Sequence, residues 1–72
     1  MEQKIIVSNY IFEDFVAGKR TALLTEVPYS VGYEEGDIIT LYPTHLGASL
    51  KMLVTFVEEI NEFEELLHLK EL

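Results

Sequence analysis

The side chains that could hold a metal ion are few in this 72-residue chain. Glu64 and His68 are four residues apart and Glu71 follows three residues later, so a helix would bring all three to one face. Carboxylate and imidazole groups can bind a divalent ion, but no third strong ligand comes from another segment, and His45 stands alone in an expected loop. We predict no metal site and interpret these residues as solvated helix polarity.

Nucleophilic side chains show no catalytic pattern either. The chain has no Cys, which excludes disulfides, thiolate zinc sites and a cysteine nucleophile. Ser8, Ser30 and Ser49 show no nucleophile-elbow context. We therefore predict a protein without catalytic residues, metal or other cofactor.

Acidic residues dominate the composition. The chain carries 13 Asp and Glu against 5 Lys and Arg, for a net charge of −8. A field of this sign repels phosphate over about 8–10 Å, so nucleic-acid binding would require a local basic patch. The acids favour solubility, and the dense C-terminal group could instead bind a basic protein partner; this group consists of Glu58, Glu59, Glu62, Glu64 and Glu65.

The elements that must position these side chains begin with a short strand at 4–8. A helix is predicted over 9–17, because Ile11 and Phe15 lie four residues apart on one apolar stripe and Ser8 or Asn9 can cap its first turn. Gly18 ends the helix. Lys19 and Arg20 then stand where the negative end of the helix dipole favours cations, which is a sufficient reason for their charges.

The rest of the chain reads as three strands and a last helix. The strands are predicted at 21–27, 38–42 and 50–60, with a turn-rich segment at 28–36. Asn61 and Glu64 form a possible capping box, and Phe63, Leu66 and Leu67 follow helical spacing. Leu69 and Leu72 would be partly exposed at the end of that helix and could favour a homodimer, so a monomer or a weak homodimer is expected.

These elements predict one α+β domain over residues 1–72. Its strands would form a small curled sheet or partly open barrel of about four or five strands, with two short helices at the ends. The longest apolar run is Ile5 to Val7, which is too short for a membrane span or a signal peptide, so a cytoplasmic protein without a membrane partner is expected.

An ordered set of motifs resembles the ASCH domains of the PUA-like superfamily. The set spans residues 9–67 and consists of Phe12, Gly18, the pair Gly36-Asp37, the strand at 52–57 and the segment at 62–67. The family's basic position falls on Arg20. Its acid and its arginine fall on Leu23 and Thr25, so the polar triplet of the family's cleft is reduced to one charge.

The resemblance implies a PUA-like barrel and a binding module for RNA or another nucleotide ligand. The family's usual site lies beside the junction of the first helix and second strand, and the residues it indicates here are Lys19, Arg20, Thr21 and Tyr29, with Lys51 and Tyr33 as further candidates. Alternatively, the tyrosines only pack loops over the core. The second functional hypothesis is an acidic protein-interaction module in which the ancestral cleft of the family no longer functions.

Amidohydrolase activity is the third hypothesis that the resemblance allows. Some similar proteins hydrolyse acylated cytidines with Lys, Thr and Glu, whose counterparts here are Arg20, Thr21 and an acid that could be Glu26, Glu58 or Glu59. A guanidinium group with a pKa above about 12 cannot act as the general base for a threonine hydroxyl. We therefore predict a binding protein that is not an enzyme.

Overall fold

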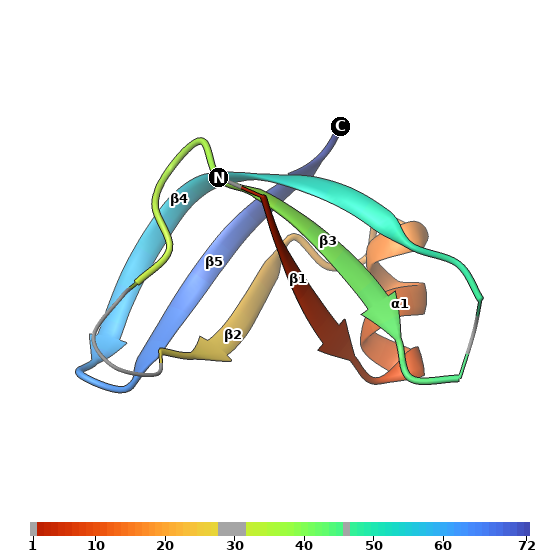
Figure 1. Ribbon diagram of the computed structural model, residues 1–72, viewed down its shortest axis with the longest axis horizontal. Helices are drawn as coiled ribbons and strands as arrows, with labels where there is room; N and C mark the ends of the chain where they lie inside the picture. Colours follow the sequence, from red (N-terminus) through yellow and green to blue (C-terminus); the bar gives the residue numbers. More distant parts are fainter. Residues whose placement is uncertain (1, 28–31, 46) are drawn as a thin grey trace.

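The computed structural model describes residues 2–27, 32–45 and 47–72 of the chain. These residues form five strands and one helix (Figure 1): β1 (Glu2–Val7), α1 (Asn9–Val16), β2 (Ala22–Glu26), β3 (Ile38–Pro43), β4 (Leu50–Asn61) and β5 (Glu64–Glu71). The strands make one sheet in the order β1-β3-β4-β5-β2, in which β1 and β3 are parallel and the other pairs antiparallel. The predicted first helix and first four strands are confirmed.

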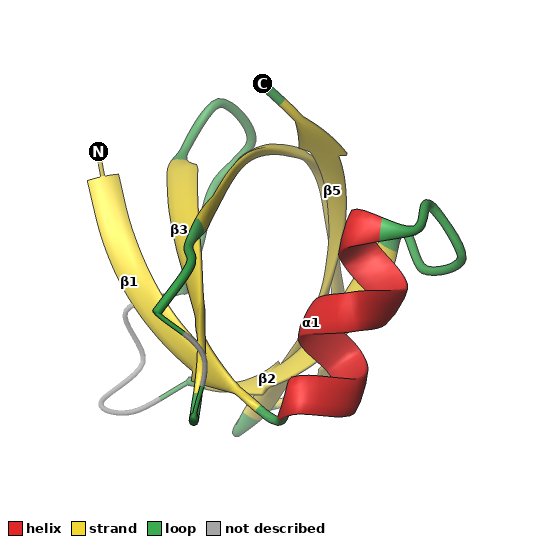
Figure 2. Ribbon diagram, turned by 90° about the vertical axis from the view of Figure 1, so that its right-hand side faces the viewer, coloured by secondary structure: helices red, strands yellow, loops and turns green. Residues whose placement is uncertain are grey.

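The sheet is strongly curled. Figure 2 shows the strands curving around a common axis, with α1 lying beside the end of the curl that faces the viewer. The two edges of the sheet are β1 and β2, which pair with β3 and β5 respectively but not with each other among the described residues. The small α+β fold with a curled sheet is therefore confirmed. In the described part of the chain, no helix combines the length and the apolar character needed to cross a membrane.

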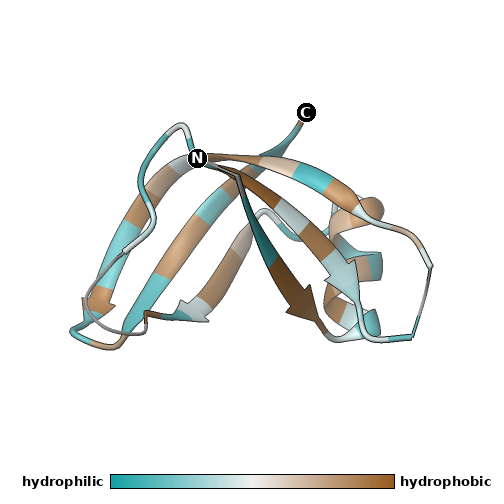
Figure 3. Ribbon diagram, viewed as in Figure 1, coloured by the Kyte–Doolittle hydropathy of each residue, from teal (hydrophilic) through white to brown (hydrophobic). Residues whose placement is uncertain are grey.

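The inner face of the curl holds the core. Apolar residues occur in all five strands (Figure 3), and those that point inward are almost completely buried. Ile39 pairs with Met52, and Leu23 pairs with Leu67, so that buried side chains of adjacent strands meet in register. Two aromatic side chains of α1 enter the same cluster, Phe12 and Phe15.

Both ends of α1 are capped by local interactions. Ser8 is extended at φ −63° and ψ 156°, and its Oγ accepts a hydrogen bond from the Ile11 N–H at 3.3 Å. Gly18 takes φ +72°, a left-handed conformation that suits glycine. The N–H groups of Gly18 and Lys19 then donate to the carbonyls of Phe15 and Asp14, at 3.1 and 2.8 Å, which is the pattern of a Schellman motif.

The predicted second helix is wrong, because residues 64–71 form the strand β5. Asn61 and Glu64 do interact, with Asn61 Nδ2 donating to Glu64 Oε1 at 2.9 Å, but they close the turn of the β4–β5 hairpin. Leu67 and Leu69 are buried while Leu66 and His68, which alternate with them along the chain, are half-buried, and this alternation is that of a strand. The expected partial exposure of Leu69 is thus also wrong.

Candidate functional site

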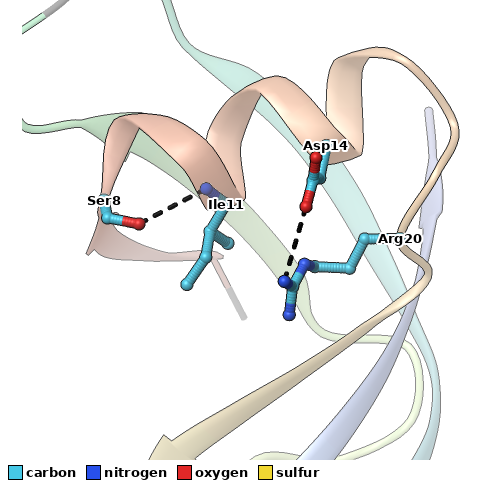
Figure 4. Close-up of polar contacts among 4 residues, drawn as sticks. All are labelled: Ser8, Ile11, Asp14 and Arg20. Carbon is cyan, nitrogen blue, oxygen red and sulfur yellow. Dashed lines mark hydrogen bonds and ion pairs between the residues drawn. The ribbon is translucent and has the colours of Figure 1, made fainter.

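The predicted nucleic-acid contacts lie in the connection between α1 and β2. Lys19, Arg20 and Thr21 are all exposed. Arg20 Nη2 lies 3.5 Å from Asp14 Oδ2 in an ion pair whose side chains are about 40% exposed (Figure 4). The structure thus brings three of the predicted residues together on the surface. The fourth, Tyr29, lies outside the described residues.

A basic residue from the other end of the chain joins this segment. The Thr21 carbonyl accepts a hydrogen bond from the Leu69 N–H at 2.8 Å, which places Lys70 beside Arg20. Lys51, named from sequence as a further candidate, lies on β4 two residues from the position that pairs with Lys70. Cations are therefore concentrated at this end of the sheet, although none of these residues lines the grooves described next.

A groove of about 880 Å³ lies at the opposite side of the molecule, where the curled sheet remains open between β1 and β2. One wall is formed by residues 4–6 of β1 and the other by residues 25–27, at the end of β2. Residues near the β4–β5 hairpin and in the segment before β3 complete it, namely Tyr33, Asn61, Phe63 and Glu64. The groove therefore combines segments that are far apart in the sequence.

The two walls of the groove are the two edges of the sheet, which pair with no strand on their groove side among the described residues. An edge strand uses its backbone groups on one side only, and the N–H and C=O groups of its other side remain available to a further strand. Two apolar side chains at the groove are unusually exposed, Ile6 at 74% and Phe63 at 66% of their surface. Hydrogen-bonding backbone and apolar side chains are thus both accessible in the same place.

A smaller acidic hollow of about 220 Å³ adjoins the groove and shares Val27 and Asn61 with it. Three carboxylates line this hollow, from Glu59, Glu62 and Glu65. The position of Glu65 is fixed, because its Oε1 accepts a hydrogen bond from the Tyr33 N–H at 2.9 Å. Three clustered carboxylates of which two are exposed form a favourable environment for a cation.

A bulky residue at position 32 would disturb the acidic hollow. A Cβ atom added to Gly32 would lie 2.5 Å from a carboxylate oxygen of Glu65, well inside van der Waals contact. The absence of a side chain here allows the backbone to approach the Glu65 carboxylate and to donate to it from the next residue.

The remaining candidates for acid–base chemistry do not converge. His68 Nε2 lies 2.7 Å from Glu58 Oε1, and among the described residues no group of three or more His, Asp or Glu side chains is placed to hold a metal ion. Glu26 ends β2 whereas Thr21 precedes that strand, so about five residues of extended chain, or roughly 16 Å, separate them. The structure does not bring Arg20 and Thr21 together with this carboxylate.

The sequence singled out part of this site and missed the rest. The acidic residues and Tyr33 were candidates, but Lys4, Ile6 and Phe63 were assigned to a buried strand or to the apolar face of a helix. A signal for the groove is absent from the sequence, because the groove depends on which two strands form the edges of the folded sheet. The exposure of Ile6 follows from its place on an edge strand, beside Tyr42 of β3.

In comparisons with models of known protein families and with curated proteins, this chain matches none of them. Its function must therefore be argued from the groove, the acidic hollow and the distribution of charge.

Proposed function

We propose that this protein is a non-catalytic binding module whose groove accepts an extended segment of a basic protein partner. The observation that carries the proposal is the pair of unpaired sheet edges that form the two walls of the groove. A polypeptide in extended conformation adds to such an edge through its own backbone, and its alternate side chains then enter neighbouring pockets. A nucleic acid has no equivalent row of alternating donors and acceptors.

Charge indicates which kind of segment fits. Glu26 and Glu64 line the groove, and Glu59, Glu62 and Glu65 line the adjoining hollow, whereas Lys4 is the basic residue of the lining. A Lys or Arg side chain of the partner would enter the acidic hollow while the backbone lies in the groove. The net charge of −8 also increases the rate at which a basic partner arrives.

The apolar side chains of the groove supply the second half of the recognition. Ile6 stands at one wall and Phe63 at the hairpin side, both largely exposed. A β-branched or aromatic residue of the partner would cover them and remove apolar surface from water. The partner segment is therefore expected to alternate basic and apolar residues.

Fluorescence anisotropy with defined peptides tests this proposal. The first probe is a labelled eight-residue peptide of alternating Val and Lys, and the second is the matched Val–Glu peptide. Two further Val–Lys peptides carry N-methyl groups on alternate residues, one on the Val and one on the Lys positions. A peptide that adds to one edge uses every second N–H of its backbone, so one of the two methylated peptides should lose at least about tenfold in affinity. If the peptide pairs with both edges, both methylated peptides should lose affinity by this amount.

Matched variants locate the binding. Ile6→Ser and Phe63→Ser are expected to weaken the Val–Lys peptide about tenfold. Val16→Ser and Tyr10→Ser remove equally exposed apolar groups from α1, outside the groove, and should leave the affinity unchanged. Equal binding of all the peptides, or equal effects of the groove and helix variants, would overturn the proposal, as would the absence of binding at millimolar peptide.

Nucleic-acid binding is the second candidate, favoured by one observation: the Thr21–Leu69 hydrogen bond brings Lys70 beside the exposed residues Lys19 and Arg20. Phosphate contacts by these cations would weaken steeply with salt and would be reduced by Arg20→Ala. A ten-nucleotide single-stranded RNA is the probe. Binding of this RNA with loss in Arg20→Ala, together with no binding of the peptides, would favour this candidate over the first.

We also propose that the fold is PUA-like and that the chain is related to the ASCH domains. In support, the motifs that suggest the relationship occur in one small fold with a curled sheet, with Phe12 of α1 in the core, Gly18 at the end of α1 and Gly36-Asp37 just before β3. A determined structure that superposes on a PUA-like barrel strand by strand would support the relationship, and a different strand order in the related domains would contradict it.

A further inference from the structure

The outer surface of β2, β5 and β4 carries an apolar patch that α1 does not cover. We call it the outer patch, and it consists of Ala22, Leu24, Phe56, Leu66 and His68. Glu58, which pairs with Leu66 on the same face, borders it, with its Oε1 2.7 Å from His68 Nε2. Leu24 pairs with Leu66, and His68 pairs with both Ala22 and Phe56, so these side chains form two adjacent rows. Leu24 and Phe56 expose about half of their surface, at 54% and 50%.

Charges of opposite sign stand at the two ends of the outer patch. Along β5 the outward-facing residues run from Lys70 through His68 and Leu66 to Glu64. On β2 the acidic end is reinforced by Glu26, which pairs with Glu64. Among the described residues, the basic end is supplied by Lys70 alone, because the guanidinium of Arg20, one residue before the acceptor of the Leu69 hydrogen bond, is paired with Asp14 of α1. The patch therefore has a direction, from basic to acidic.

We propose that the outer patch is the contact surface of a homodimer in which two copies stack face to face with their β5 strands antiparallel. A two-fold axis between the sheets, crossing the strands midway between Leu66 and His68, places Lys70 of each copy against Glu64 of the other. Packed sheets lie about 10 Å apart, which the side chains of Lys and Glu span together. A parallel stacking would oppose Lys70 to Lys70.

The charge pattern is the reason for choosing a second copy as the occupant. Along β5 the outward surface has a basic end, a half-buried centre and an acidic end. When a second copy faces it with β5 in the opposite direction, each basic end lies against an acidic end, and an isologous interface requires such self-complementarity. The aromatic ring of Phe56 is already packed against His68, with ring centroids 5.5 Å apart, so this part of the surface is ordered before contact.

The size of the outer patch sets the strength of the dimer. Three strands of about five residues cover roughly 14 by 16 Å, or about 200–250 Å² per copy, against about 800 Å² in a standard stable interface. The net charge of each copy opposes association, but this repulsion is screened beyond about 8 Å at physiological salt. The dimer is therefore transient and forms at high protein concentration.

Sedimentation equilibrium of the full chain, from 10 µM to 1 mM in 0.15 M salt, tests the dimer. Dimer is expected in the upper part of this range. Lys70→Glu should raise the dissociation constant at least about fivefold, and Lys70→Glu combined with Glu64→Lys should recover most of the loss because the two opposed charges are exchanged. Phe56→Ser should also weaken the dimer, whereas the exposed helix variant Val16→Ser serves as the control.

Three outcomes would overturn the proposal. The first is a monomer throughout the concentration range, and the second is association that Lys70→Glu and Phe56→Ser leave unchanged. The third is a dimer that Ile6→Ser abolishes, because it would then form through the edges at the groove. Circular dichroism of each variant confirms that the fold is retained, so that a change in association is not caused by unfolding.

Discussion

The two faces of the sheet use the same strands for different purposes. On β5 the inward residues Leu67 and Leu69 are buried, at 0% and 4% exposure, while the outward residues Leu66 and His68 alternate with them and remain accessible. The inner face joins all five strands and α1 into one core. The outer face carries the charges and the outer patch. A shift of one position along a strand therefore separates a residue that stabilises the fold from one that is available for contacts.

The largest expected effect is on the inner face. Leu67→Ala should destabilise the protein by about 2–5 kcal/mol, because it removes a fully buried side chain from the centre of the sheet. A domain of this size retains only a few kcal/mol of net stability, so the variant should be largely unfolded. Leu66→Ala, one residue away on the outer face, should lose about 1 kcal/mol or less. Urea unfolding at 25 °C measures both, and equal losses would contradict the assignment of faces.

A smaller effect is expected where the register of β3 is set. Gly36 has φ +91°, and its N–H donates to the Val54 carbonyl at 2.8 Å, just before the strand begins. Gly36→Ala should lose about 1–2 kcal/mol, because a side chain is strained in this conformation even though open space surrounds it.

Gly47→Ala is the matched control for this position. Gly47 also lies in open space but has no left-handed φ, so the change should be neutral or stabilising by up to about 1 kcal/mol. Thermal unfolding of the two variants compares them, and an equal shift in both would refute the role of the Gly36 backbone in fixing which residues of β3 face inward.

The smallest effect is expected at an ion pair outside both faces. Asp14 and Arg20 are half-exposed and 3.5 Å apart, so Asp14→Asn should reduce stability by about 0.5 kcal/mol or less. A double-mutant cycle with Arg20→Gln isolates the interaction, which should vanish at high salt. A coupling energy above about 1 kcal/mol would show that this pair holds the α1–β2 connection in place.

Much of the fold was predictable because its local signals agree with its tertiary structure. Ser8, the apolar stripe and Gly18 define α1, and the β-branched runs define β1, β3 and β4. The last segment failed because Phe63, Leu66 and Leu67 fit helical spacing while Leu67 and Leu69 fit the period of a strand. An eight-residue segment gains little from helix propensity alone. Pairing with β4 on one side and β2 on the other decides in favour of the strand.

The candidate site was less predictable than the fold. Consecutive charges such as Lys19 and Arg20 are visible in a sequence, whereas Lys70 joins them only because β5 pairs with the start of β2. The groove depends on the strand order, which puts β1 and β2 at the two edges of the sheet, and no local sequence pattern shows which strands will be edge strands. The acidic cluster was recognised from composition, but its division into outward residues and a hollow follows from the hairpin.

Strands β1 and β2 follow each other in the chain, yet they form the opposite edges of the sheet, and α1 is the link between them. The two edges are thus joined twice, once through the paired strands β3, β4 and β5 and once through the helix, which Phe12 and Phe15 anchor in the core. Widening the opening would have to disturb the packing of this helix as well as the curl of the sheet.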